Sequence, residues 1–263
     1  MNRLTRRFLR HGRTGFGLIS ALRAPAWYLA FFREYRAFKK RHNAARREMR
    51  IEFSDLFPCL GENTATTTFD AHYVYHTAWA ARKVRAHGPR EHVDVSSSLY
   101  FAGIVSAFVP IRFLDYRPAG LGLTGLDEES GDLLRLPLQD ESIESLSCMH
   151  VVEHVGLGRY GDRLDPLGDR KSASELERVL AEGGRLLFVV PVGDARIYFN
   201  AHRVYHPEQV LAMFPSLKLL SFALVTDAGQ FRDPAPLELG AEQSYGCGCF
   251  EFVKEPHRGG AHG

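Results

Sequence analysis

The 263-residue chain is poor in cysteine and has no long apolar run. Its four cysteines are scattered, and Cys247 and Cys249 are too close for an unstrained disulfide and lack a second pair to complete a zinc site. We therefore expect reduced cysteines and a cytoplasmic protein. The longest apolar segment, residues 24–32, is about half as long as a membrane-spanning helix. No convincing signal-peptide cleavage pattern is present.

Acidic residues are scarce in the first fifty positions. Residues 1–50 contain 14 Lys and Arg against Glu34 and Glu48, so this arm has a net charge of about +12 and the remainder one of about −10. The near-neutral total of +2 therefore conceals two parts of opposite charge.

The basic arm contains an amphipathic pattern between residues 27 and 38. At the helical period, its aromatic side chains share one face and Arg33, Arg36 and Lys40 lie opposite. Such a helix suits an anionic membrane surface, which would make the protein peripheral on the inner membrane face. The alternatives are docking on the main domain or a partner, nucleic-acid binding without a recognised module, and an Arg-rich transit peptide.

Composition and breakers divide the chain into four predicted parts. Residues 1–50 are the basic helical arm, and residues 51–90 form an entry loop followed by a lid helix. The loop contains Pro58 and Gly61 as breakers, and Asp70 is a suitable N-cap for the helix. Residues 91–255 form the main domain, and residues 256–263 a disordered tail.

The main domain alternates short apolar strands with helices. Strands are predicted at residues 92–95, 111–114, 121–126, 143–149, 185–190, 217–225 and 249–254. Helices are predicted at residues 99–108, 173–181 and 207–214, the second capped by Gly183 and Gly184. This order predicts an α/β fold: a doubly wound, Rossmann-like, mostly parallel seven-stranded sheet with an antiparallel C-terminal hairpin.

Several segments carry a resemblance to a known superfamily. HVDVSSS ends the first strand, SGDLLRLP forms an acidic turn, and HVVEHVGLGRYGDRLDP precedes a Gly-Gly turn and a strand ending at Pro191. Residues 90–254 resemble class I S-adenosylmethionine (SAM) dependent methyltransferases. With DLFPCLGENTATTTFDAHYVYHTAWAAR added, residues 55–254 resemble a poorly characterised bacterial group of methyltransferase-like domains.

The resemblance implies roles for individual residues. Asp94 and the loop Ser96–Ser98 would bind the methionine part of SAM, and Asp115 would contact the ribose diol. Asp132 matches the acid that contacts the adenine amine, and Leu133 the residue that packs on its ring. His150 follows the fourth strand, whose carboxyl end faces the transferred methyl group, and is therefore expected both to bind the cofactor and to act in catalysis.

The first motif departs from the family pattern. The family has acid-x-Gly-x-Gly-x-Gly, whereas Ser96, Ser98 and Tyr100 occupy the glycine positions here. A serine at positive φ costs on the order of 1 kcal/mol, and its Cβ occupies space. The serines could compensate by binding the SAM carboxylate, or the pocket could be altered or lost.

HVVEH also matches a zinc-peptidase motif. His150 and His154 would share a metal on one face of a helix, with Glu153 as general base. That motif must lie inside a helix, whereas residues 143–149 are predicted to form a strand leading into it. We therefore predict no metal here and keep a zinc hydrolase as the least favoured hypothesis.

The lid helix supplies further candidate residues. His72 and His76 share one helical face, and either could act as general base on a hydroxyl acceptor, since an unperturbed histidine has a pKa of about 6.5. The alternative is that they pack or anchor loops. Residues that would contact the substrate are Tyr73, Glu153, His154, Arg159 and Tyr160.

The leading hypothesis is SAM-dependent O-methylation of a small-molecule or glycan acceptor, at a membrane surface if the arm binds one. No Asn/Asp-Pro-Pro-Tyr/Phe motif follows the fourth strand, and the main domain is acidic, so a nucleic-acid substrate is not expected. The alternative is a non-catalytic methyltransferase-like module that binds a ligand or partner. The sequence leads to no prediction of the oligomeric state.

Overall fold

The computed structural model describes residues 18–46 and 48–256. The chain divides into two compact units, residues 1–68 and residues 69–263. The finer division at residues 50, 90 and 255 stays a prediction. The predicted disordered tail lies outside the described residues except for Pro256, as do the first 17 residues of the arm.

The first unit contains the long helix α2 (Leu18–Ala44) and the short 3-10 helix η1 (Phe53–Asp55). The Phe32 ring of α2 stacks on Phe53, with 6.3 Å between centroids. A Cβ added to Gly61 would lie 3.3 Å from the Trp27 ring. The segment after the helix therefore covers part of its aromatic face within this unit.

The second unit is built on an eight-stranded sheet with the order β3-β2-β1-β4-β5-β10-β8-β9. The first five strands in that order pair in parallel, and β10 is antiparallel to both β5 and β8. This confirms the predicted fold, with β9 as a short addition at one edge. The strands are β1 (His92–Val95), β2 (Ile111–Asp115), β3 (Leu126–Ser130), β4 (Ile143–Met149), β5 (Leu180–Val192), β8 (Leu217–Val225), β9 (Phe231–Arg232) and β10 (Gly246–Lys254).

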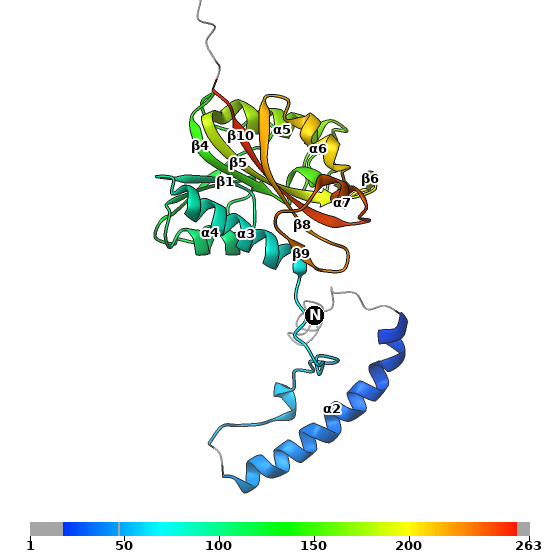
Figure 1. The fold of residues 1–263 in the computed structure, drawn as a ribbon. Coiled ribbons are helices and arrows are strands. Elements are labelled where there is room, and N and C mark those ends of the chain that lie inside the picture. The colour runs from blue at the N-terminus through cyan, green and yellow to red at the C-terminus, as the bar shows by residue number, and fades with distance from the viewer. Residues whose placement is uncertain (1–17, 47, 257–263) are drawn as a thin grey trace, which may run out of the picture. The chain divides into compact units, whose positions relative to one another are not determined.

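Helices cover both faces of the sheet. Figure 1 shows α3 and α4 on one face and α5 and α6 on the other, and a buried apolar cluster lies under each pair. Helices therefore shield both faces of the sheet from solvent, which explains why all four residues of β1 are buried. The helices are α3 (Ala71–His87), α4 (Leu99–Val105), η2 (Val152–His154), α5 (Gly168–Val179), α6 (Pro207–Met213) and α7 (Leu237–Ala241).

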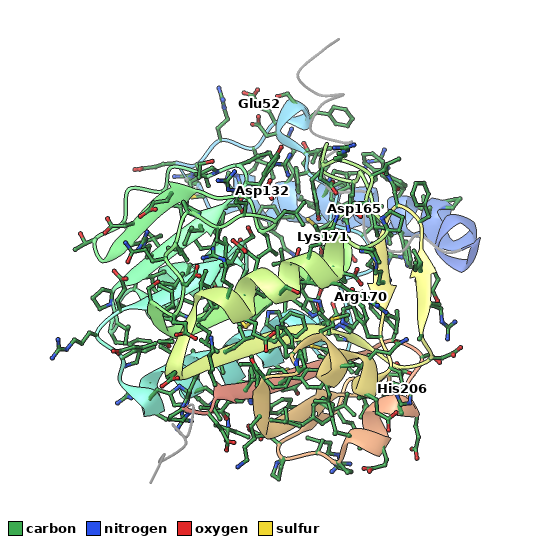
Figure 2. All side chains as sticks on the ribbon, turned by 90° about the horizontal axis from the view of Figure 1, so that it is seen from above. Glu52, Asp132, Asp165, Arg170, Lys171 and His206 are labelled. Carbon is green, nitrogen blue, oxygen red and sulfur yellow. The ribbon has the colours of Figure 1, made fainter. Side chains whose placement is uncertain are left out.

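Two helices begin at side chains that satisfy free backbone donors. The Asp70 carboxylate accepts from Tyr73 N at 3.1 Å, as predicted for the start of α3. His206 caps α6 through a capping box with Gln209. Figure 2 shows Asp165 and Lys171 together at the start of α5, where their side chains pair at 2.6 Å.

Several predicted boundaries differ from the observed ones, and two assignments were wrong. The third strand covers residues 126–130 rather than 121–126, because an acidic edge strand with one exposed face carries little apolar signal. Gly183 and Gly184 do not cap α5, which ends at Val179 and continues directly into β5. The glycines lie inside β5, where its register with β4 shifts.

A hairpin of β6 (Arg196–Tyr198) and β7 (His202–Val204) follows β5 and was not predicted. Among the described residues, every helix is too short or too polar to cross a bilayer.

Candidate functional site

Most of the predicted site residues meet at one edge of the sheet. The parallel strands β1 and β4 end there at Val95 and Met149, and the antiparallel strand β10 begins there at Gly246. In an open α/β sheet, the carboxyl ends of parallel strands form the usual ligand crevice. The residues that follow β1 and β4, and those that begin β10, therefore share one neighbourhood.

The serine loop after β1 is held by hydrogen bonds within the protein. Ser96 has a φ of 56°, as a glycine at this turn would, and its Oγ donates to the Leu114 carbonyl at 3.2 Å. Ser97 Oγ accepts from Met149 N at 3.0 Å, which ties the loop to the end of β4. Ser98 precedes α4 with an extended φ of −66°. Only the first of the three missing glycines is thus at positive φ.

Asp94 lies fully buried beneath this loop. One carboxylate oxygen accepts from Ser97 N at 3.0 Å, and the other accepts from the Ser147 hydroxyl. Burial raises the pKa of Asp94 to about 6, against the opposing effect of hydrogen bonds from Ser147 and Ser97. The structure therefore gives Asp94 a role in shaping the loop, and direct contact with a cofactor stays a prediction.

The other predicted cofactor residues lie at the ends of β2 and β3. Asp115 ends β2 and accepts from Arg117 N at 2.7 Å. Asp132 is exposed in the turn after β3, where it accepts from Leu134 N at 2.9 Å. Leu133 is buried in the main apolar cluster. Figure 2 labels Asp132 near the loops at this side of the sheet.

The predicted catalytic residues His72 and His76 both lie next to the third, His150. His150 follows β4 with a φ of 57°, a turn that points its ring towards α3. Its ring centroid lies 5.7 Å from that of His72, 5.5 Å from Tyr73 and 5.0 Å from His76. Helix α3 and the turn after β4 thus bring these side chains together, and their catalytic role stays a prediction.

HVVEH does not form the helix of a zinc peptidase. Its residues leave β4 and form only the 3-10 turn Val152–His154. His150 Nδ1 lies 2.8 Å from Glu153 Oε1, whereas His154 Nδ1 lies 2.6 Å from the Ala201 carbonyl. His154 lies farther from the carboxylate, with its Nε2 3.7 Å from Glu153 Oε1, so its main partner is a backbone carbonyl and that of His150 is the carboxylate.

Glu153 is the acid at the centre of the site, although the sequence placed it only near the substrate. Its side chain is 1% exposed, and its Oε2 has no hydrogen-bond partner among the described residues. Burial raises the pKa of Glu153 to about 7, and the charge of His154 opposes that rise. Of the predicted groups, it has the pKa best matched to proton transfer at neutral pH.

The histidine pKa values differ from the ordinary value assumed from sequence. Burial and the neighbouring His150 lower the pKa of His72 to about 4 and that of His76 to about 3. Burial also lowers the pKa of His150 to about 4. All three are therefore neutral at pH 7, and none by itself is a strong base.

Three residues that the sequence did not indicate complete the cluster. Cys247 Sγ lies 3.4 Å from His150 Nε2. Tyr245 stacks on His72 with 5.2 Å between centroids, and His202 of β7 lies 4.9 Å from Tyr245. The predicted antiparallel final strand was the available signal, because it begins at the same edge at which β4 ends.

The loop after η2 carries the predicted substrate residues. The Arg159 guanidinium lies over the Tyr160 ring at 5.0 Å and donates to the Ala201 carbonyl at 3.2 Å. Tyr160 meets the His154 ring edge to face, with 5.8 Å between centroids. Arg159, Tyr160 and His154 thus form a polar group next to the β6–β7 hairpin.

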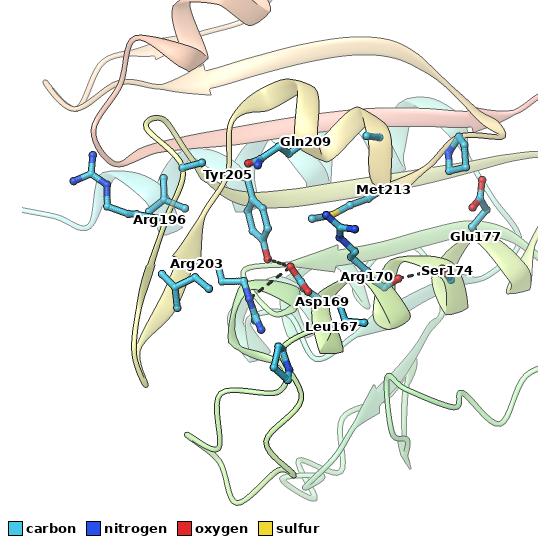
Figure 3. Close-up of a pocket in the computed structure, with 16 residues that line it drawn as sticks. Leu167, Asp169, Arg170, Ser174, Glu177, Arg196, Arg203, Tyr205, Gln209 and Met213 are labelled. Carbon is cyan, nitrogen blue, oxygen red and sulfur yellow. Dashed lines mark hydrogen bonds and ion pairs between the residues drawn. The ribbon is translucent and has the colours of Figure 1, made fainter.

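A separate pocket of about 690 Å³ lies between α5, α6 and the β6–β7 hairpin. Figure 3 shows Asp169, Arg203 and Tyr205 on its floor, where Tyr205 donates to Asp169 at 3.1 Å. The predicted site residues do not line this pocket. The histidine cluster and the serine loop therefore form a different site.

Comparisons with known proteins agree on the fold. A family model described as Caenorhabditis protein of unknown function, DUF268, matches residues 139–233, about a third of the chain. The [4+2]-cyclase SpnF is similar over 68% of this chain and 80% of its own, with 16% identity and a TM-score of 0.50. A Burkholderia thailandensis 1,6-didemethyltoxoflavin-N1-methyltransferase, solved with S-adenosylhomocysteine, is similar over 69% and 79%, with 11% identity and a TM-score of 0.51. No curated protein matches the chain. The second unit thus has the fold of class I methyltransferases.

Proposed function

We propose that the protein is a SAM-dependent methyltransferase that acts on the oxygen of a small-molecule or glycan acceptor. The observation that carries this proposal is the common edge at which the serine loop, Asp115 and the His150–Glu153 pair follow strands of a methyltransferase-type sheet. The bound S-adenosylhomocysteine of the Burkholderia neighbour supports the choice of cofactor. Fold alone does not determine a reaction, so the residues of the edge must carry the chemistry.

The residues at this edge fit a nucleoside bearing an amino acid. Asp115 and the exposed Asp132 follow neighbouring strands and offer carboxylates to a ribose diol and an adenine amine. The Ser96–Ser98 loop offers hydroxyls and backbone groups to the methionine part. When bound, SAM would supply an electrophilic methyl group on a sulfonium.

The acceptor hydroxyl must lose a proton, and the His150–Glu153 pair suits that step. His150 Nδ1 donates to Glu153 Oε1 at 2.8 Å when the glutamate is ionised, which leaves Nε2, 3.4 Å from Cys247 Sγ, unprotonated and able to take a proton. Glu153 then stabilises the resulting imidazolium, as acids paired with histidine do in other enzymes. Because the pKa of Glu153 is raised to about 7, the pair changes its proton content near neutral pH.

The remaining residues orient the acceptor. His72 and Tyr73 stack on His150 from α3 and limit the space above its ring. Arg159 and Tyr160 offer a cation and a hydroxyl to a polar acceptor such as a sugar. Positioning of this kind accounts for much of the rate in direct displacement reactions.

Calorimetric titration with SAM and with S-adenosylhomocysteine tests the proposal. Binding of both, weakened at least tenfold by Asp115→Ala and by Asp132→Ala, is expected. Ser174→Ala on α5 is a matched surface control and leaves both affinities unchanged. Absence of binding near millimolar concentration overturns the proposal. Transfer of labelled methyl groups to a panel of sugars and phenols then identifies the acceptor class.

A non-catalytic binding module is the second candidate, and one observation favours it. Ser96 takes the strained φ of 56° while its Oγ is used by Leu114 O, and both Asp94 oxygens are also used internally. SpnF, named as a cyclase, illustrates that this fold is not confined to methyl transfer. Binding of S-adenosylhomocysteine without methyl transfer to any acceptor supports this candidate.

We also propose that residues 1–50 bring the protein to an anionic membrane surface. Their net charge of about +12 and the exposed Phe38 on the aromatic face of α2 support this role. Flotation with vesicles containing phosphatidylserine should carry the full chain upward at low salt and less at high salt. Equal flotation with neutral vesicles, or none with either, contradicts the role.

A further inference from the structure

Three potential metal ligands meet within the histidine cluster. One donor atom each from His72, His150 and Cys247 lies within 4.8 Å of the other two. They come from three elements that are distant in sequence: α3, the turn after β4, and β10. Their proximity is therefore produced by the fold and not by the local sequence. The cysteine is fully buried, and the neighbouring histidines are residues with which it could share a metal ion.

The spacing of His150 and Cys247 suits tetrahedral coordination, and His72 lies close enough to join them after a side-chain rotation. With metal–nitrogen and metal–sulfur bonds of typical zinc length, neighbouring N and S ligands lie about 3.5 Å apart. His150 Nε2 and Cys247 Sγ lie 3.4 Å apart. The pair therefore needs little rearrangement to bind one ion. A donor set of two imidazoles and one thiolate binds Zn²⁺ in preference to Mg²⁺ or Ca²⁺, which favour oxygen ligands.

A carboxylate orients the central ligand. His150 Nδ1 lies 2.8 Å from Glu153 Oε1, so the carboxylate fixes the ring and directs Nε2 towards Cys247. A carboxylate on the far nitrogen is the usual partner of a metal-binding histidine. This arrangement differs from the one expected of HVVEH, because His154 bonds to the Ala201 carbonyl instead of sharing the ion.

Two residues that contact His150 each have a buried polar atom that a metal-bound group could satisfy. His76 Nε2 and Glu153 Oε2 are buried without a hydrogen-bond partner among the described residues. The His76 ring lies 5.0 Å from that of His150. Buried polar atoms are rarely left unpaired, and a metal-bound water or hydroxyl would supply a partner.

We propose that His72, His150 and Cys247 bind one Zn²⁺ ion and leave its fourth position open to the acceptor. Three protein ligands with an open position characterise catalytic rather than structural zinc sites. A hydroxyl or thiol bound there loses its proton near neutral pH because the ion stabilises the anion. The site therefore selects acceptors with a hydroxyl or thiol.

This inference rests on the proposed methyltransferase function and changes one part of it. With zinc on His150 Nε2, the acceptor proton leaves to solvent because the metal lowers the pKa of the acceptor. Glu153 then keeps the role of orienting His150. The serine loop, Asp115 and Asp132 are not metal ligands, so SAM binding through them and metal binding can be tested separately.

Cobalt titration of the full-length, chelator-treated protein tests the metal site, because Co²⁺ reports its ligands by absorption. We expect one equivalent to bind, with a thiolate-to-cobalt charge-transfer band and the visible bands of tetrahedral Co²⁺, both displaced by Zn²⁺ but not by Mg²⁺. Cys247→Ser should remove the charge-transfer band and weaken binding at least tenfold. Cys249→Ser is the matched control, as it lies on the same face of β10 and is equally buried.

The half-exposed His72 provides a second variant if Cys247→Ser fails to fold. His72→Ala should weaken Co²⁺ binding at least tenfold and alter the visible bands while the thiolate band persists. The proposal is overturned if the folded wild type shows no thiolate band, if the band survives Cys247→Ser, or if Cys249→Ser removes it equally. Calorimetry with SAM on the same samples separates the two hypotheses: SAM binding without cobalt removes only the metal site, and cobalt binding without SAM removes only the methyltransferase function.

Discussion

Two buried glutamates are linked to opposite ends of α3, Glu153 through His150 and Glu251 through Lys83 and His87, and they differ in their partners and in their pKa values. Glu153 is 1% exposed near the N-terminal half of the helix, and Glu251 is 3% exposed beneath the C-terminal half. Burial raises the pKa of Glu153 to about 7. Burial acts on Glu251 in the same direction, but hydrogen bonds from His87, Lys83, Ser221 and Arg185 outweigh it and hold its pKa well below the usual range.

The partners explain the difference. Both oxygens of Glu251 are bonded: Oε2 to Lys83 and Ser221, and Oε1 to His87 and Arg185, all at 2.7 to 2.9 Å. Glu153 Oε1 bonds to His150, whereas Oε2 has no hydrogen-bond partner among the described residues. A fully paired buried carboxylate stabilises the fold, whereas a poorly paired one is held ready for chemistry.

The largest expected effect comes from removing the charge of Glu251. Glu251→Gln leaves Lys83 and Arg185 without their counter-charge and should lower the free energy of unfolding by about 2–3 kcal/mol. This is less than the cost of breaking a fully buried pair, because Arg185 is 41% exposed. Urea unfolding at pH 7 measures the loss. Glu153→Gln is the matched control and should not lower the free energy of unfolding. Equal losses in the two variants would contradict the proposed difference between the two glutamates.

Two buried histidines extend the same contrast to neutral groups. Both nitrogens of His92 bond to serines, Ser145 at 2.7 Å and Ser147 at 2.8 Å. Within the described part of the chain, His76 uses only Nδ1, which lies 2.7 Å from the His72 carbonyl, and its Nε2 has no partner. His92→Leu removes a hydrogen-bond partner of two buried serine hydroxyls and should lower the free energy of unfolding by about 2 kcal/mol. His76→Leu should change the free energy of unfolding by less than about 1 kcal/mol. Thermal unfolding compares them. A His76→Leu loss as large as that of His92→Leu would mean that His76 is a structural residue.

The sequence predicted most of the fold because the apolar strands are covered on both faces. The predicted limits of β8, residues 217–225, agree with those observed. The third strand was misplaced because LDEES forms an exposed edge without an apolar pattern. Gly183 and Gly184 were misassigned because a glycine pair marks a bulge in a strand as well as the end of a helix.

The site was less predictable because its members depend on long-range register. The histidines could be named from their positions before β1 and after β4. Cys247 joins them only because β10 pairs with β5 so that Cys247 lies opposite Pro191. The raised pKa of Glu153 depends on complete burial, which the motif HVVEH does not reveal.

The pH dependence of stability should have opposite signs for the two glutamates. The folded pKa of Glu153 is about 7 against a usual 4.5, so its contribution is fully present below pH 4.5 and is lost as the pH rises through 7. The lowered pKa of Glu251 makes its contribution present above pH 4.5 and lost as the pH falls. Glu153→Gln should therefore be more stable than wild type at pH 8 and no more stable than wild type at pH 4. A gain that does not change between these pH values would contradict the assignment.

The smallest expected effect concerns Ser96, which carries backbone strain at the same end of the sheet as Glu153. Its φ of 56° disfavours any residue with a Cβ, while its Oγ donates to Leu114 O. Ser96→Gly relieves about 1 kcal/mol of strain and loses one hydrogen bond, so stability should stay level or rise by less than 1 kcal/mol. Ser96→Ala keeps the Cβ, loses the hydrogen bond and should lower the free energy of unfolding by about 0.5–1 kcal/mol.

Calorimetry with SAM on the same variants shows whether Ser96 serves binding. If the serine binds SAM, Ser96→Gly should bind SAM more weakly although its stability is unchanged. If the serine only stands where the resembled methyltransferases have a glycine, the affinity of Ser96→Gly for SAM should rise. Unfolding and binding measured together on the two variants therefore separate strain kept for function from strain merely tolerated.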